Sequence, residues 1–234
     1  MQPGWERVGR AGERQPEARS LDRGERGAAV LQIDNWDHRI SGWARRETPI
    51  FGSQQNATEW SDRLRSTSAY AYFATVALTP GGDEPGPWLL DKARGLAVGG
   101  AAIVVTDEES SLLKHASARE RPNGQDDQSM PSSHASRSAV LTELGRRNMQ
   151  WIAVSATERA VIDAGLTGLT LATGWARVEG GFHYPSDVLV GMAIGDFNGA
   201  FFNDAFMALP EPGRVAFAVE PVHAGARLRV RLVW

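Results

Sequence analysis

Hydrophobic side chains recur at every third or fourth residue along most of this chain, which is the spacing that places them on one face of a helix. The longest stretch begins near Trp88, where leucine, isoleucine and valine residues form a broad apolar face as far as Leu113. The pattern predicts helices over residues 36–43, 58–78, 88–113, 133–148, 157–173 and 185–207.

Turn and cap residues mark the ends of several of these helices. A Thr-Pro-Gly-Gly run that starts at Thr79 stops the second helix. Ser132 or Ser133 offers an N-cap for the fourth, and Pro185 suits the first turn of the last. The helices are therefore separated by short polar connections, and polar clusters lie at their ends.

The C-terminal end has a different pattern. Residues 215–219 and 228–233 alternate between apolar and polar side chains, with a proline and a glycine between the two runs. Such alternation predicts a β-hairpin. We therefore expect an all-α fold, a helical bundle over residues 29–209, with a small C-terminal β-hairpin as an extension over residues 210–234.

Residues 1–28 differ from the rest because arginine, glutamate and glycine dominate and large apolar residues are few. A segment of this composition buries too little surface to offset the entropy of ordering, so we expect a flexible N-terminal tail. It contains no apolar run that would serve as a signal-peptide core. Apolar runs elsewhere, such as residues 188–194, are shorter than the roughly 20 residues that span a bilayer, and no transmembrane segment is expected.

Composition narrows the possible functions. The chain has 42% hydrophobic and 23% charged residues, as ordinary soluble globular proteins do. Its formal net charge of -3 argues against nucleic acid as a partner, because nucleic-acid binders usually carry a basic excess. It has no cysteine, which excludes disulfides, thiolate metal ligands and a cysteine nucleophile.

Three polar stretches at the ends of the predicted helices carry candidate chemistry, and two of them supply positive charge. Lys114 ends the third helix, and Arg121 and Arg177 present planar guanidiniums that suit phosphate oxygens. Taken singly, each of these side chains is most often a solvated surface charge. They become informative only beside the histidines of the other stretches.

The second stretch is Pro131-Ser132-Ser133-His134. A helix start with free backbone N–H groups binds anions readily. His134 lies in its first turn and can donate a proton to a leaving oxygen, because imidazole titrates near neutral pH. The same four residues are also explained as a plain helix start, and the residues alone leave both interpretations open.

The third stretch holds His183 and, four residues later, Asp187. A carboxylate in the first turn of the last helix can turn back to the imidazole N–H and fix its tautomer. The other ring nitrogen would then be the nucleophile. A helix-terminal charge beside a packing histidine is the alternative explanation of this pair.

In this order and spacing, the three stretches resemble the motifs of the type-2 phosphatidic acid phosphatase superfamily, which includes class A acid phosphatases, lipid phosphatases and vanadium-dependent haloperoxidases. The motifs are Lys114 with six residues before Arg121-Pro122, the Pro-Ser-Ser-His of residues 131–134, and Arg177 with five residues before His183 and three more before Asp187. The resemblance covers residues 114–187 and implies the acid phosphatase and haloperoxidase type of helical bundle.

The resemblance implies a metal-independent phosphatase, in which His183 attacks phosphorus to form a phosphohistidine and Asp187 orients it. His134 would protonate the leaving alcohol and then activate water. No cofactor is implied, although vanadate is expected to act as an inhibitor or a phosphate surrogate. The implied substrate is a phosphate monoester of a small molecule, or a lipid phosphate or diphosphate. The implied phosphate ligands are Lys114, Arg121, Ser132, Ser133 and Arg177.

Two positions depart from the family's usual pattern. Ser133 stands in place of a glycine, and Ala176 stands in place of a serine before Arg177. These changes motivate one alternative, a catalytically silent anion-binding envelope protein. A vanadium-dependent haloperoxidase is another. The resemblance also implies a periplasmic or envelope location, although no signal peptide is visible in this chain.

Overall fold

The structure, a computed structural model, describes residues 35–81 and 84–207, together with the backbone of residues 215–222 and 225–232. The tail expected over residues 1–28 lies outside this part of the chain. The described residues confirm the predicted all-α bundle. Its helices are α2 (Trp36–Glu47), α3 (Gln54–Leu78), α4 (Pro85–Ser117), α5 (Ser133–Met149), α6 (Ala156–Glu179) and α7 (Pro185–Phe206).

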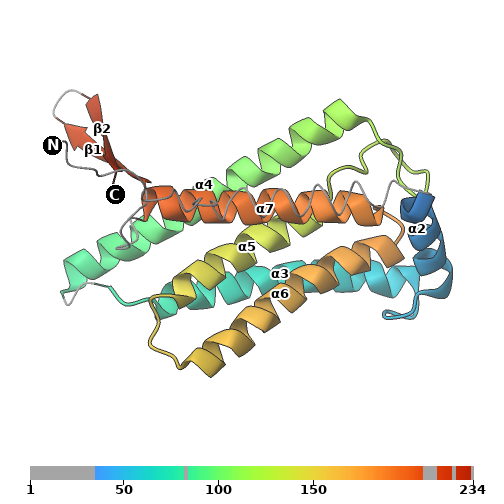
Figure 1. The fold of residues 1–234 in the computed structure, drawn as a ribbon, viewed down its shortest axis with the longest axis horizontal. Coiled ribbons are helices and arrows are strands. Elements are labelled where there is room, and N and C mark those ends of the chain that lie inside the picture. The colour runs from blue at the N-terminus through green and yellow to red at the C-terminus, as the bar shows by residue number, and fades with distance from the viewer. Residues whose placement is uncertain (1–34, 82–83, 208–214, 223–224, 233–234) are drawn as a thin grey trace, which may run out of the picture.

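Helix α5 is the centre of the bundle. It packs against α3, α4, α6 and α7, while the short α2 lies at one end (Figure 1). One apolar cluster joins α5 to α3 and α4 and includes Tyr72, Val140 and Leu144. A second joins α5 to α6 and α7 and includes Val178 and Val188. Helix α5 therefore contributes residues to both clusters.

Small and hydroxyl side chains fill much of the interior between the helices. Pairs of buried hydroxyls satisfy each other across helix interfaces, which avoids the cost of an unpaired polar group. The shortest separations between the paired oxygens are Thr142 to Thr170 at 2.7 Å, Ser68 to Ser138 at 2.8 Å and Ser110 to Ser136 at 3.0 Å. These small side chains let the helices approach closely.

Helix α4 buries a different face from the one that its leucines and valines suggest. Its buried residues are small or polar, and most of its large apolar residues are exposed. The sequence predicted the helix correctly, but the small-residue face packs against α5 and α7 because it permits a closer approach. The buried residues of α4 are Lys92, Gly99, Ala102, Thr106, Ser110 and Lys114, and its exposed large ones are Trp88, Leu89, Leu90, Leu96, Val104, Leu112 and Leu113.

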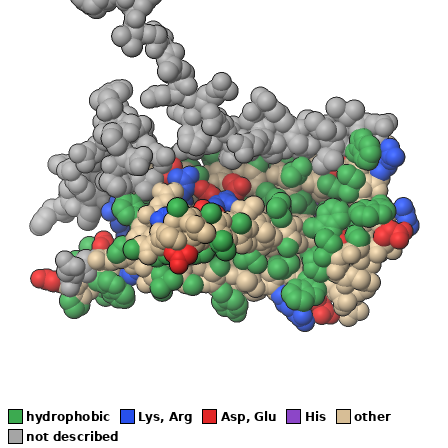
Figure 2. Space-filling model, turned by 60° about the horizontal axis from the view of Figure 1, so that its bottom comes forward, with side chains coloured by type: hydrophobic (Ala, Val, Ile, Leu, Met, Phe, Trp, Pro, Cys, Tyr) green, Lys and Arg blue, Asp and Glu red, His purple; other side chains and the backbone are tan. Residues whose placement is uncertain are grey.

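Hydrophobic side chains are exposed elsewhere too. Figure 2 shows them along one face of the molecule, interrupted by polar and charged groups. Tyr70 on α3 and Val161 on α6 are among the most exposed of them. Among the helices that the structure describes, we find none with the length and hydropathy of a membrane span.

Several helices extend further than the sequence pattern indicated, and the extensions of α6 and α4 matter for the motifs. Helix α6 continues past Thr173 to Glu179, which places Arg177 in its last turn. Helix α4 continues to Ser117, so Lys114 also lies in a last turn.

At the C-terminal end, strands β1 (Val215–Val222) and β2 (Gly225–Leu232) pair antiparallel, with Val215 opposite Leu232.

Candidate active site

The three sequence motifs meet at the end of the bundle where α2 lies (Figure 1). Lys114 and Arg177 lie in the last turns of α4 and α6. Ser132 caps α5, and Asp187 lies in the first turn of α7. The backbone N–H of Ser132 donates to the carbonyl oxygen of Asp187 at 3.0 Å. This bond ties the second motif to the third.

His183 is buried, with 2% of its surface exposed. Its Nδ1 lies 2.6 Å from the backbone carbonyl oxygen of Ser129. A carbonyl oxygen only accepts, so Nδ1 carries the proton and Nε2 keeps its lone pair in the neutral ring. Burial lowers the pKa of His183 well below its usual value, and the charges of Arg177, Lys114 and Arg121 lower it further. His183 is therefore a neutral imidazole with a lone pair on Nε2 and positively charged side chains near it.

The described contacts correct one expectation, because Asp187 does not bond His183 directly. Asp187 Oδ2 accepts from the Ser129 hydroxyl at 2.6 Å and from the backbone N–H of Tyr184 at 2.7 Å. Its Oδ1 accepts from Nη1 of Arg119 at 2.6 Å. The carboxylate thus turns back onto the start of its own helix, and Ser129 stands between it and the imidazole. Burial raises the pKa of Asp187, while the Ser129 hydroxyl and Arg119 oppose that rise.

Lys114 and Arg121 approach the site from the end of α4 and the loop that follows it. Lys114 is buried, and its Nζ donates to the carbonyl oxygen of Gln128 at 2.7 Å. Arg121 Nε donates to the Asp126 carboxylate at 2.5 Å. Burial, followed by repulsion from Arg121, lowers the pKa of Lys114 to about 8. A bound anion would relieve this repulsion.

Arg177 is almost completely buried, with 7% of its surface exposed. Its Nη1 donates to the Ser61 hydroxyl at 3.3 Å, while its Nε is buried and has no hydrogen-bond partner among the described residues. The guanidinium lies 3.9 Å above the ring centroid of Phe182, and that of Arg121 lies 5.6 Å from the same centroid. Burial, followed by repulsion from Arg121, lowers the pKa of Arg177 to about 10. A buried donor without an acceptor is costly, so this site favours an anionic ligand.

His134 lies in the first turn of α5, and its Nε2 is 2.9 Å from Oδ1 of Asp62 on α3. An ionised carboxylate only accepts, so Nε2 is the donor. Burial lowers the pKa of His134 to about 4, Arg177 lowers it as well, and the bond to Asp62 opposes both. The same bond lowers the pKa of Asp62. An anion beside His134 would favour its protonated form.

The two serines of the second motif have different environments. Ser132 is fully buried, and its Oγ accepts the backbone N–H of Ala135 at 3.4 Å as the N-cap of α5. Ser133 is the first residue of α5 and is half-buried. The structure thus assigns the Ser132 hydroxyl to the cap, and the helix start supplies backbone donors at Ser133. Phosphate contacts by either serine stay a prediction.

The motifs did not indicate several residues that reach the same site. Arg119 lies inside the first motif, and its position between Lys114 and Arg121 could have identified it as a candidate site residue. Ser129 lies two residues before Pro131, with no local pattern to mark it. Asp62 on α3 and Asp37 on α2 come from helices far away in the sequence, so only the folded chain reveals them.

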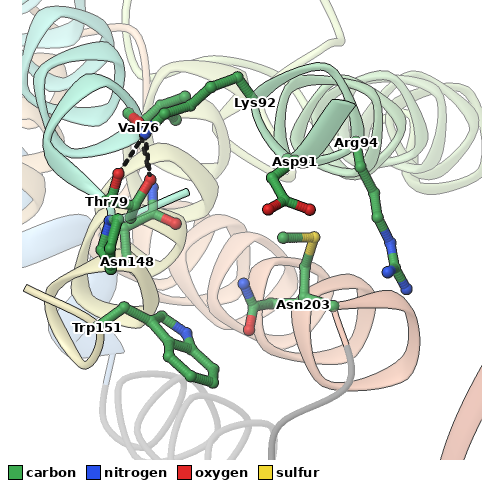
Figure 3. A pocket seen from close by; sticks show the side chains of 11 residues that line it. Val76, Thr79, Asp91, Lys92, Arg94, Asn148, Trp151 and Asn203 are labelled. Atoms are coloured by element: carbon green, nitrogen blue, oxygen red, sulfur yellow. Dashed lines mark hydrogen bonds between the residues drawn. The ribbon is translucent and has the colours of Figure 1, made fainter. Parts of the chain in front are cut away.

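A separate cavity of about 230 Å³ lies at the opposite end of the bundle, where α3, α5 and α7 end and α4 begins (Figure 3). Lys92, Asn148 and Trp151 line it, and none of the motif residues does. Lys92 Nζ donates to the carbonyl oxygen of Val76 at 2.7 Å.

Within the described residues, no group of three or more histidine, aspartate or glutamate side chains is placed to hold a metal ion.

Comparison with known proteins agrees with this geometry. The model of the PAP2 superfamily matches residues 70–205, which is more than half of the chain. The protein therefore belongs to the PAP2 superfamily. No curated protein matches the sequence. Residues 37 and 62, which both contribute carboxylates to the site, lie before the matched range.

A solved structure shows the same fold. It is the crystal structure of a transmembrane PAP2-type phosphatidylglycerolphosphate phosphatase from Bacillus subtilis. The two chains are 17% identical and superpose with a TM-score of 0.57, over 80% of this chain and 94% of that one. The arrangement of helices is therefore that of the PAP2 fold.

Proposed function

We propose that this protein is a phosphatase that hydrolyses phosphate monoesters or lipid phosphates and diphosphates through a phosphohistidine at His183. The observation that carries the proposal is the state of that imidazole. It is buried and neutral, its Nδ1 proton is engaged by Ser129, and three cations lie around it. Phosphoryl transfer needs mainly positioning and positive charge, and this cluster supplies both.

The first step is attack by Nε2 of His183 on phosphorus. The P–N bond forms while the bond from phosphorus to the ester oxygen breaks, and His134 gives its proton to the leaving oxygen. Since Nε2 of His134 is engaged by Asp62, the Nδ1 proton of the imidazolium is the one available. The negative charge of bound phosphate raises the pKa of His134 and makes this proton available near neutral pH.

The second step releases phosphate. His134, now neutral, accepts a proton from water as the water oxygen attacks phosphorus, and the P–N bond breaks. His183 returns to the neutral form, with Nδ1 still protonated and donating to the carbonyl oxygen of Ser129. Lys114, Arg121 and Arg177 hold the phosphoryl oxygens in both steps, and Arg177 Nε gains the acceptor that it lacks among the described residues.

A lipid phosphate is among the substrates because of two observations. The superfamily model matches over residues 70–205, and the solved structure with the same fold is named as a phosphatidylglycerolphosphate phosphatase. A phosphate monoester of a small molecule is the other substrate class, since the cluster around His183 binds the phosphoryl group and not the alcohol.

Phosphate release from p-nitrophenyl phosphate and from phosphatidic acid between about pH 4 and 8 tests the proposal. We expect release that vanadate inhibits, and an acid-labile phosphoryl group on His183 after rapid quenching. A folded protein that releases no phosphate from either substrate contradicts the proposal. Halide oxidation with vanadate and peroxide, in place of phosphate release, would identify a haloperoxidase.

A further inference from the structure

Asp37 is a fully buried carboxylate on α2 that belongs to none of the three motifs. An isolated buried charge is strongly unfavourable, so its partners indicate why it is there. Its Oδ1 accepts the backbone N–H of Ser186 at 2.9 Å, and its Oδ2 accepts from Nη2 of Arg119 at 2.6 Å. It therefore holds both the start of α7 and a side chain of the first motif.

Arg119 connects Asp37 to the catalytic cluster. Its Nη2 bonds Asp37, and its Nη1 bonds Oδ1 of Asp187 at 2.6 Å and the Ser186 hydroxyl at 2.8 Å. The guanidinium lies 4.2 Å from the ring centroid of Tyr184. A planar fork held by two carboxylates and an aromatic ring has little freedom to rotate. Asp37 is thus the second anchor that fixes Arg119 against Asp187.

The contacts continue from Asp187 to the imidazole. Asp187 Oδ2 accepts from the Ser129 hydroxyl, and the carbonyl oxygen of the same serine accepts from His183 Nδ1, both at 2.6 Å. Ser129 is therefore held at its side chain and holds the histidine with its backbone. A displacement of Asp187 would move Ser129, and with it the ring of His183.

We propose that Asp37 is a positioning residue for catalysis, which acts through Arg119, Asp187 and Ser129 to hold the His183 ring in its Nδ1-protonated orientation. This inference rests on the proposed phosphatase function. Helix α2 then has a role in the reaction, although it lies before the range that the superfamily model matches. The hydrogen bonds of Asp37 go to Arg119 and Ser186, which belong to the support of the imidazole, so its replacement should affect kcat much more than KM.

The test uses the full chain with Asp37→Asn, which keeps the size of the side chain and an acceptor for Ser186 but loses the charge that holds Arg119. We expect kcat with p-nitrophenyl phosphate to fall by about 10- to 100-fold, the range typical when an orienting partner of a catalytic group is removed, with KM unchanged. Asp204→Asn is the control. Asp204 is also largely buried, and it pairs with Arg147 at 2.5 Å at the other end of the bundle. We expect the Asp204→Asn variant to have the same kcat as the parent.

A double-mutant cycle separates positioning from general loss of stability. If Asp37 and Ser129 act in one chain of contacts, Asp37→Asn and Ser129→Ala together should lower kcat little more than the stronger single change does. Independent effects that multiply would overturn the inference. If Asp37→Asn does not fold, Arg119→Lys replaces it in the cycle, because lysine keeps the charge but lacks the planar fork that fixes the geometry between the two carboxylates.

The nitrogen-15 NMR signals of His183, assigned with a His183→Gln variant, give a readout that needs no activity. We expect the Nδ1-protonated tautomer in the parent and in Asp204→Asn, and a shifted or averaged signal in Asp37→Asn. An unshifted His183 signal with parental kcat in folded Asp37→Asn would overturn the inference. If the parent releases no phosphate, the phosphatase proposal fails, while the ring signal still decides whether Asp37 positions His183.

Discussion

His183 and Ser129 are joined by a 2.6 Å contact between the imidazole Nδ1 and a backbone carbonyl oxygen. Because the partner is a main-chain oxygen, its ability to accept a hydrogen bond does not change with pH in the range where proteins are folded. The tautomer of His183 is therefore set by the path of the loop before α5, and the carboxylate of Asp187 contributes by holding that loop.

Replacing His183 by glutamine should abolish phosphate release. We expect kcat/KM for p-nitrophenyl phosphate to fall by at least about 10³-fold, because the variant has no nucleophile in reach of phosphorus. His115→Gln is the matched control, since His115 is exposed on the last turn of α4. Comparable activity in the two variants would remove His183 from the mechanism. Steady-state kinetics at one pH is sufficient for this comparison.

Asp62→Asn should move the pH dependence of kcat toward lower pH. The bond to Asp62 raises the pKa of His134, so losing the carboxylate lowers that pKa. A general acid works only when it is protonated, and kcat therefore falls as pH rises through the pKa of His134 in the substrate complex. In the variant this fall should begin at a lower pH.

The measurement is kcat at saturating p-nitrophenyl phosphate across the pH range. Asp91→Asn serves as the control, because Asp91 is an exposed carboxylate that lines the distant cavity. An identical pH profile in parent and Asp62→Asn would show that Asp62 does not support the acid.

Acid should destabilise the fold through His134, and His134→Gln should lessen the effect. The pKa of this group is about 4 in the folded state, well below the usual histidine value of about 6.5. Between these two pKa values the unfolded state therefore binds more protons than the folded state. The contribution of neutral His134 to the free energy of unfolding is fully present above about pH 6.5 and is lost as pH falls toward about 4. Between pH 7 and 5 the loss is about 2 kcal/mol.

Urea unfolding of the parent and His134→Gln at both pH values measures this contribution as a difference. The difference is needed because other buried groups titrate in the same range, such as Asp196, whose pKa is raised to about 6 by burial. We expect the parent to lose more stability on acidification than the variant. Equal losses would mean that His134 is protonated equally easily in the folded and unfolded chains.

Gly195→Ala and Gly168→Ala should have opposite effects on stability. A Cβ at position 195 would lie 2.2 Å from the carbonyl oxygen of Ser136, so α7 would have to move away from α5. We expect a loss of about 1–3 kcal/mol, as for other overpacked sites. At position 168 on α6 no atom lies within 4 Å of the added Cβ, and the change from glycine should stabilise the helix by about 0.5–1 kcal/mol.

Thermal or urea unfolding of both variants tests this contrast. The close approach of α5 and α7 also carries the Ser132 to Asp187 bond, so Gly195→Ala should reduce activity in addition to stability. A Gly195→Ala protein as stable as the parent would indicate that the two helices pack less tightly than the structure shows.

The sequence by itself determined the helices, their caps and the three motifs, because these depend on residues within a few positions of one another. Hydrophobic periodicity predicted α3 to α7 to within a few residues at most ends, and motif spacing indicated His134 and His183. The buried face of α4 was not predictable in the same way. The helix carries both large apolar and small side chains, and only the close approach of neighbouring helices makes the small face the buried one.

Only the tertiary structure decided how the site is supported. Asp37 and Ser186, or Asp62 and His134, are far apart in the chain, and nothing in their local sequence marks them as partners. The bond from His183 to a main-chain oxygen of Ser129 has no side-chain signature at all. The physical reason is that local patterns report the conformation of a segment, whereas the orientation of an imidazole is set by whichever groups the packing of the helices brings next to it.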